Sequence, residues 1–294
     1  MALALLMVTL AAACGDEASP GSGSFPVEVE GTRIPAAPQR IVSAGASHTE
    51  ILYAIGAGGR IVATDQFSDY PSAAAATPKL DAFNLGVEAV ASFDPDLVIL
   101  SFDPGDLQAG LTALDIPTLL LAPPASLEDV YGQMEALGEA VGRPGEASAL
   151  VAEMAAEVTR ITDAVPERAS APTYYYELDP TLYSLTSQTF VGGLLALLGL
   201  ENIADAADDG TGYPQLSPEH VLAADPDFIL LADTRCCGQS ASTVAERPGW
   251  GSLAAVGAGR VVELDDNLAQ RWGPRVVDLL AVVAEAVYGG AGPG

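Results

Sequence analysis

The 294-residue sequence predicts an α/β protein with two Rossmann-like lobes, each built on a central parallel sheet, joined by one long α-helix. Three observations predict this fold. Strand-like and helix-like segments alternate along the chain, which is typical of α/β folds. A helix–strand unit around Glu88 returns in altered form around Glu219, which indicates two related halves. One amphipathic stretch between the halves is long enough to connect them.

The recurring unit occupies residues 87–100 (VEAVASFDPDLVIL) and 218–231 (PEHVLAADPDFILL), which are 131 residues apart. Each copy has the pattern of a short helix, a break at Asp-Pro and then a strand. Pro95 and Pro226 end the helices because proline disfavours helical geometry in the residue before it. The apolar run that follows has no polar alternation, as expected for a strand that is covered on both faces of a parallel sheet.

The remaining patterns divide the chain into its elements. In the first lobe we expect strands at 40–43, 61–63, 97–100 and 118–121, and in the second at 173–178, 228–231 and 261–264. Capping boxes are predicted at Ser47 with Glu50 and at Ser126 with Asp129, each opening a helix. The predicted segments are a signal peptide (1–13), a lipid-anchored flexible tether (14–34), an N-terminal lobe (35–145), a linker helix (146–166) and a C-terminal lobe (167–294).

The linker helix is predicted from a single apolar stripe. Ala147, Met154 and Ile161 recur at helical spacing between the break at 142–145 and Pro166, which stops the helix. At 1.5 Å per residue this stretch spans about 30 Å, which suffices to bridge two lobes rigidly.

The first residues predict export. The run MALALLMVTLAAA is apolar, ends in small residues and precedes Cys14. This arrangement resembles the lipobox of bacterial lipoproteins, and the resemblance implies cleavage before Cys14 and a diacylglycerol on its sulfur. An ordinary secretory signal cut at Ala13 is the alternative. The run is too short to span a bilayer. We therefore expect a protein anchored at the outer face of the cytoplasmic membrane, with no membrane contact besides the lipid.

The composition is strongly acidic: 39 Asp and Glu residues against 12 Lys and Arg residues give a formal net charge of −27. Such a surface repels nucleic acid and anionic membranes, so no nucleic-acid partner is expected. It favours basic protein partners and neutral or cationic ligands. Solubility is the plainer explanation for most of these charges.

The motifs of common catalytic sites are absent from the sequence. It contains no Gly-x-Ser-x-Gly elbow, Walker loop, His-Glu-x-x-His or Cys-x-x-Cys. His48 and His220 lie at unrelated places, so no zinc site, cofactor or enzymatic activity is expected. One alternative stays open, because Cys236 and Cys237, next to Arg235, would suit an exported thiol enzyme. In an oxidising compartment these two cysteines can instead form a strained vicinal disulfide at the rim of the cleft, with two free thiols as the alternative.

Candidate ligand contacts follow the strands, because ligands of open parallel sheets bind beyond the carboxyl ends of the strands. His48, at a helix start, either contacts a ligand or lies on the surface. Aromatic side chains supply contact surface for a flat or bulky ligand. The full candidate set is His48, Phe67, Tyr70, Phe83, Phe102, Tyr176, Tyr183, Phe190, Tyr213, Arg235 and Trp272.

The order of elements resembles the helix-linked (class III) solute-binding proteins of ABC importers for cobalamin, iron–siderophores and haem. Ser68-Asp69-Tyr70-Pro71 is similar to the cobalamin-binding branch, and so is Glu88 followed by Asp94-Pro95-Asp96. The resemblance covers about residues 35–290. It implies a ligand held between two lobes, no catalysis, and a permease with its ATPase as partners. Glutamates equivalent to Glu88 and Glu219 in that family pair with permease arginines, so these two are the predicted docking residues of a monomer.

The ligand predicted from this resemblance is a metal chelate, with a corrinoid preferred. The cleft loops carry many carboxylates, among them Asp65, Asp69, Asp179 and Asp233, and few cations. A strongly anionic ferric catecholate would need a basic pocket to offset the desolvation of its charge. The aromatic residue expected near position 82 in the cobalamin branch is Ala82, with Phe83 beside it. An iron–siderophore or haem receptor is the alternative, and an adhesion lipoprotein is a third class.

Overall fold

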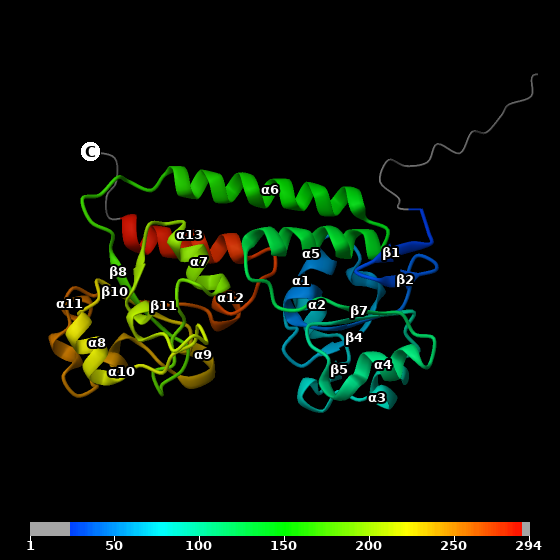
Figure 1. Ribbon diagram of the computed structural model, residues 1–294, viewed down its shortest axis with the longest axis horizontal. Helices are drawn as coiled ribbons and strands as arrows, with labels where there is room; N and C mark the ends of the chain where they lie inside the picture. The colour runs from blue at the N-terminus through cyan, green and yellow to red at the C-terminus, as the bar shows by residue number, and fades with distance from the viewer. Residues whose placement is uncertain (1–23, 290–294) are drawn as a thin grey trace, which may run out of the picture.

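The computed structural model describes residues 24–289, and it places two α/β lobes next to each other along one long helix, α6 (Pro144–Asp163) (Figure 1). Each lobe contains its own parallel sheet, so the predicted fold class is confirmed. Residues 1–23, with the predicted signal and Cys14, lie outside the described part. Within the described part, no helix combines the length and apolar character that crossing a bilayer requires.

The N-terminal sheet has the strand order β5-β4-β3-β6-β7, and every pair is parallel. All residues of its central strands β3 and β6 are buried, as their continuous apolar patterns predict. The strands are β3 (Ile41–Ala44), β4 (Ile61–Asp65), β5 (Lys79–Leu80), β6 (Leu97–Leu100) and β7 (Thr118–Leu120). The helices are α1 (Ala46–Ala54), α2 (Ser72–Ala75), α3 (Val87–Ala91), α4 (Leu107–Thr112) and α5 (Leu127–Ala140), with 3-10 turns at Gly58–Arg60, Ala82–Asn84 and Pro104–Asp106.

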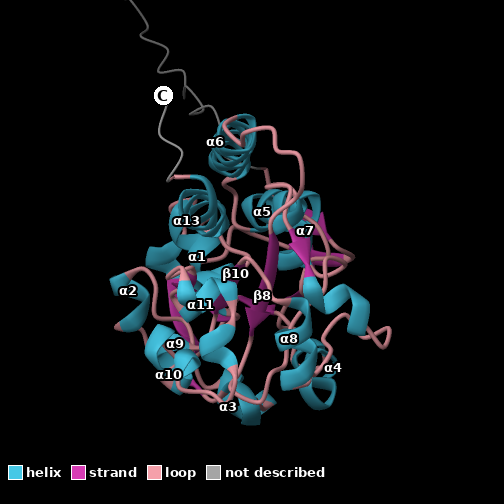
Figure 2. Ribbon diagram, turned by 90° about the vertical axis from the view of Figure 1, so that its left-hand side faces the viewer, coloured by secondary structure: helices cyan, strands magenta, loops and turns pink. Residues whose placement is uncertain are grey.

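The C-terminal sheet is also parallel, in the order β11-β10-β8-β9, and helices lie on both sides of the sheets (Figure 2). Its strands are β8 (Thr173–Glu177), β9 (Glu201–Asn202), β10 (Phe228–Leu231) and β11 (Val261–Glu263). Its helices are α7 (Phe190–Ala196), α8 (Pro218–Ala224), α9 (Thr234–Cys237), α10 (Ala241–Ala245), α11 (Ala254–Gly257), α12 (Asp266–Ala269) and α13 (Val276–Tyr288), with 3-10 turns at Ile203–Ala207 and Trp250–Ser252.

The two copies of the recurring unit have the same local structure. Asp94 and Asp225 both take positive φ, 48° and 42°, immediately before the proline that separates helix from strand. Asp tolerates this left-handed conformation better than most residues. Two positions later, Asp96 accepts a hydrogen bond from the backbone amide of Arg40 at 2.8 Å, and Asp227 accepts one from Thr173 at 2.9 Å. Each carboxylate thus ties the start of a central strand, β6 or β10, to the start of its neighbour.

Helix α6 packs on both lobes through the predicted stripe. Ala147, Met154, Val158 and Ile161 are buried and belong to one apolar cluster that also includes α5 and α13. The helix begins at Pro144, two residues before the predicted start, because proline fits the first turn of a helix, where its missing amide costs no hydrogen bond. In Figure 1, α6 lies over α5 on one side and α13 on the other.

The predicted flexible tether, residues 14–34, is wrong over its last third. Residues 27–34 form an antiparallel hairpin of β1 (Val27–Val29) and β2 (Thr32–Ile34), with Val29 and Ile34 buried in the core. Glu30 and Gly31 have φ values of 47° and 73°, the positive pair that a tight hairpin turn requires. The alternation of apolar and polar residues on either side of this turn is the strand signal that the prediction overlooked.

One of the two predicted capping boxes is confirmed. Ser126 accepts from the amide of Asp129, whose carboxylate accepts from the amide of Ser126 in return. The box at Ser47 and Glu50 is wrong: α1 begins after Gly45 without any side-chain cap. Ser47 and Glu50 are instead engaged by the other lobe.

Candidate functional site

A cleft of about 840 Å³ lies between the lobes, at the carboxyl ends of the strands of both sheets. This is the edge at which parallel sheets bind ligands, because the loops that follow the strands converge there. Its walls come from the segments that follow β3, β4, β5, β6 and β7 in one lobe and β8, β10 and β11 in the other. It is lined by Ala44, Gly45, Ala46, Ser47, Asp65, Phe67, Asp69, Ala82, Phe83, Ser101, Phe102, Pro123, Leu178, Asp179, Arg235, Cys236, Cys237, Asp266, Asn267, Gln270, Arg271 and Trp272.

The N-terminal wall presents three exposed phenylalanines. Phe67, Phe83 and Phe102 are 49%, 79% and 51% exposed, which is unusual for aromatic side chains without a partner. Phe67 and Phe83 meet edge to face, with ring centroids 5.7 Å apart. Asp65 holds the first loop by accepting from the amides of Phe67 and Ser68, and Asp81 holds the second by accepting from the amide of Phe83. The wall is therefore apolar, and its backbone is fixed by buried or local carboxylates.

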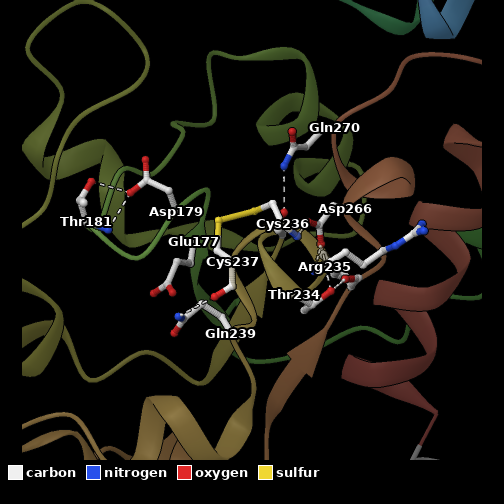
Figure 3. Close-up of a disulfide and its surroundings, with 12 residues drawn as sticks. Glu177, Asp179, Thr181, Thr234, Arg235, Cys236, Cys237, Gln239, Asp266 and Gln270 are labelled. Carbon is white, nitrogen blue, oxygen red and sulfur yellow. Dashed lines mark hydrogen bonds between the residues drawn. A yellow bond between two sulfur atoms is a disulfide. The ribbon is translucent and has the colours of Figure 1, made fainter. Parts of the chain in front are cut away.

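The C-terminal wall is more polar. Leu178 and Asp179 follow β8, and Asp179 accepts hydrogen bonds from the amide and hydroxyl of Thr181. Cys236 and Cys237 follow β10 and are joined by a disulfide (Figure 3). Arg235, beside them, pairs with Asp265 at 3.1 Å.

Ion pairs connect the two lobes at the base of the cleft. Buried Glu50 of α1 accepts from Arg271 at 2.9 Å and from Arg275 at 2.6 Å. Arg271 also pairs with Asp69 at 2.9 Å, and Asn267 donates to the same carboxylate. Burial is the largest single influence and opposes ionisation of Asp69, but the hydrogen bond and charge of Arg271 together with the hydrogen bond from Asn267 outweigh it and lower the pKa of this carboxyl. These ion pairs thus hold the two cleft walls in a fixed relative position, and their charges are already satisfied within the protein.

The structure brings five of the predicted ligand residues together in the cleft: Phe67, Phe83, Phe102, Arg235 and Trp272. Tyr176 is fully buried and donates to the carbonyl of Ala269, so its prediction as a ligand contact is wrong. Phe190 packs against the core at the start of α7. Tyr70 lies under the guanidinium of Arg275, 4.0 Å from it, and outside the lining. Tyr183 and Tyr213 are exposed but do not line the cleft either.

His48 is completely buried, so neither alternative proposed for it, ligand contact or surface, is correct. Its Nε2 lies 3.2 Å from Oε1 of Gln133, and its ring meets Trp272 edge to face at 6.1 Å. Burial lowers the pKa of His48 to about 4, so the ring is neutral near pH 7. It supports Trp272 from behind the cleft.

Sequence reasoning missed several lining residues. Leu178 directly follows β8, while Asn267 and Gln270 follow β11, which is the position rule that identified the aromatic candidates. The predicted set contains only aromatic residues, His48 and Arg235, so it omits these aliphatic and amide side chains. Ser47 does not cap α1 as predicted; its Oγ accepts from the backbone amide of Trp272 at 3.1 Å.

The predicted docking residues lie outside the cleft. Glu88 and Glu219 are exposed in the first turns of α3 and α8, one in each lobe, and these helices lie away from α6 (Figure 1). Glu88 and Glu219 occupy equivalent positions in the two lobes because each belongs to one copy of the recurring helix–strand unit.

Comparisons with known proteins identify the architecture. Residues 41–268 match a family model described as periplasmic binding protein. An ABC transporter substrate-binding lipoprotein of Bacillus subtilis is 30% identical, with 97% of this chain and 95% of the relative covered. A cobalamin-binding protein of Halobacterium salinarum is 29% identical, with 85% and 70% covered. The structure of a periplasmic heme-binding protein from Roseiflexus has a TM-score of 0.77 at 27% identity, with 86% and 99% covered.

Proposed function

The chain belongs to the periplasmic binding protein family and is a substrate-binding protein of an ABC transporter, not an enzyme. From this premise we propose that it binds a near-neutral metal chelate, and specifically a corrinoid, between its lobes. The cobalamin-binding relative supports this choice. We also propose that the ligand passes to a permease, which works together with its ATPase. A lipid on Cys14 anchors the protein to the outer face of the membrane in this proposal. The substrate-binding relative is itself a lipoprotein.

The observation that carries the proposal is the donor set of the cleft. Among the described residues that line it, none is a histidine, a tyrosine or a methionine, and both cysteines are bonded to each other. These are the side chains that hold the iron of haem proteins. Cyanocobalamin carries both axial ligands of its cobalt within its own structure and needs none from the protein.

Charge supports the same class of ligand. The cations among the described lining residues are Arg235 and Arg271, and each already faces a carboxylate. An anionic siderophore or a pair of haem propionates would have to break these pairs or stay unmatched, which is costly in a partly desolvated site. Three phenylalanines provide the apolar surface that a corrin ring with amide side chains can use.

Calorimetric titration tests the proposal directly. Cyanocobalamin should bind with measurable heat, and hemin and a ferric catecholate should bind more weakly. Phe102→Ala should weaken cyanocobalamin binding by about tenfold or more, because it removes a large apolar contact. Tyr213→Ala is the matched control, since Tyr213 is 52% exposed against 51% for Phe102 but lies outside the lining. Tight binding of hemin without heat from cyanocobalamin would move the assignment to the haem branch, which the Roseiflexus structure represents.

A further inference from the structure

The disulfide between Cys236 and Cys237 has a place in the cleft that the transport function does not by itself explain. Both residues line the cleft and both are exposed, so the sulfur pair forms part of the wall that a ligand would meet (Figure 3). The side chains of neighbouring residues in a helical turn ordinarily point in different directions. The bond removes this divergence and gives the two sulfurs one common face.

The turn that carries the disulfide is held from behind. The carboxylate of Asp266 accepts from the amides of Arg235 and Cys236, at 2.9 and 2.7 Å, and from the hydroxyl of Thr234 at 2.9 Å. Gly238 then ends the turn at a φ of 68°. These contacts join the loops after β10 and β11, so the sulfurs have a fixed position relative to the rest of the wall.

The two walls of the cleft differ in what they offer an apolar ligand. The N-terminal wall has three exposed phenylalanines, Phe67, Phe83 and Phe102. The lining residues of the other lobe include Asp179, Arg235, Asp266, Asn267, Gln270 and Arg271, all polar or charged. Among the described residues of that lobe, the apolar contributions to the lining are Leu178, Trp272 and the disulfide.

We propose that the Cys236–Cys237 disulfide is a contact of the C-terminal lobe for the apolar surface of the chelate, opposing the phenylalanines of the other lobe. The inference rests on the proposed function and specifies how that site recognises its ligand. Sulfur is polarizable and packs well against π-systems, and a bonded pair has no S–H group to leave unsatisfied. A disulfide is also rigid, so little side-chain freedom is lost when the ligand binds.

Two double variants test the contact by calorimetry with cyanocobalamin. Cys236→Ala with Cys237→Ala should weaken binding about tenfold, and Cys236→Ser with Cys237→Ser should weaken it further, because hydroxyls replace an apolar face. Leu197→Ala is the control, an exposed apolar residue outside the lining. Thermal unfolding of each variant shows that the fold is retained. Affinity equal to that of the wild type in both double variants would overturn the proposal.

Protection of the disulfide is a second, independent readout, carried out in the Cys14→Ser background so that only two thiols can form. Dithiothreitol reduces the disulfide and is itself oxidised to its cyclic disulfide; iodoacetamide then adds one label to each of the two thiols. Saturating cyanocobalamin should slow the appearance of the doubly labelled mass. Equal rates with and without the ligand would overturn the contact, as would two labels before any reductant is added.

The outcomes separate this proposal from the function on which it rests. If the wild type binds hemin and not cyanocobalamin, the corrinoid assignment fails, and both readouts are repeated with hemin. Protection by hemin and weaker hemin binding in the alanine pair would then support the disulfide contact. Absence of both effects would overturn it, and binding of neither chelate would overturn both proposals.

Discussion

The carboxylate of Glu50 accepts hydrogen bonds from Nε and Nη2 of Arg275, at 2.9 and 2.6 Å, across 225 residues of sequence. Glu50 belongs to the first helix of the N-terminal lobe, and Arg275 immediately precedes the last helix of the C-terminal lobe. Together with Arg271, the pair closes the base of the cleft and keeps the lobes in one relative position.

Glu50→Gln should destabilise the protein strongly. The substitution leaves Arg271 and Arg275, whose side chains are 10% and 21% exposed, without their shared carboxylate. Loss of one partner from a buried ion pair costs about 3–5 kcal/mol. The midpoint of urea unfolding measures the loss. Glu157→Gln, which breaks the exposed pair with Arg160 on α6, is the control and should leave the midpoint unchanged; an equal shift in both variants would show that the inter-lobe position is not special.

His48→Gln should reduce the loss of the free energy of unfolding that the wild type undergoes between neutral and acidic pH. The pKa of His48 is about 4 in the folded protein, lowered by burial from 6.5. As the pH falls, His48 therefore takes up a proton in the unfolded chain before it does so in the folded protein. Its contribution to stability is present above pH 6.5 and is lost as the pH falls towards 4. The difference in the free energy of unfolding between wild type and variant should change by on the order of 3 kcal/mol between pH 7 and pH 4. Urea unfolding at the two pH values measures it, and parallel curves would contradict the assignment.

Asp233→Asn should have the opposite pH dependence. Asp233 is fully buried after β10, and burial, followed by the charge of Glu177, raises its pKa to about 7. A raised pKa in the folded state means that its contribution is present below the ordinary value of 3.8 and is lost as the pH rises through 7. The variant should thus be more stable than the wild type at pH 8, by roughly 1–2 kcal/mol, and this advantage should shrink at pH 5. Exposed Asp163→Asn controls for removal of one negative charge; a variant that is less stable at pH 8 would refute the assignment.

Alanine at both Glu88 and Glu219 should abolish uptake of cyanocobalamin by cells that carry the cognate permease and ATPase. Both carboxylates are exposed, one on each lobe, where two equivalent contacts can position both lobes on a transporter. Calorimetry should show unchanged ligand binding, since neither residue lines the cleft. Glu139→Ala with Glu153→Ala, exposed on α5 and α6, is the control pair and should transport normally. Normal uptake by the Glu88 and Glu219 variant would exclude them as docking residues.

Cys14→Ala should release the protein from the membrane. The apolar run and the small residues before Cys14 predict a lipid on its sulfur. Two acyl chains suffice for stable anchoring. Detergent phase partitioning should therefore move from the detergent to the aqueous phase in the variant. Aqueous partitioning of the wild type would point to a secretory signal cut at Ala13 instead.

The parts of the fold that depend on local pattern were predictable. The continuous apolar runs at 97–100 and 228–231 specify buried parallel strands, and the stripe on α6 specifies a helix covered along one side. The recurring Asp-Pro-Asp unit predicts equivalent turns in both lobes, and the structure has them. Phe67, Phe83 and Phe102 were found because loops that follow parallel strands share one edge of the sheet.

Pairings across long sequence distances were not predictable, because a side chain offers the same donors and acceptors to near and distant partners. Ser47 and Glu50 fit a capping box by spacing, but their partners are Trp272 and the arginines beyond it. Sequence by itself determined the two lobes, the linking helix and the edge at which the cleft lies, since each follows from local periodicity. Only the tertiary structure decided which aromatic residues reach the cleft, that His48 is buried behind it, and that its cations are already neutralised, because burial and pairing depend on how the two lobes meet.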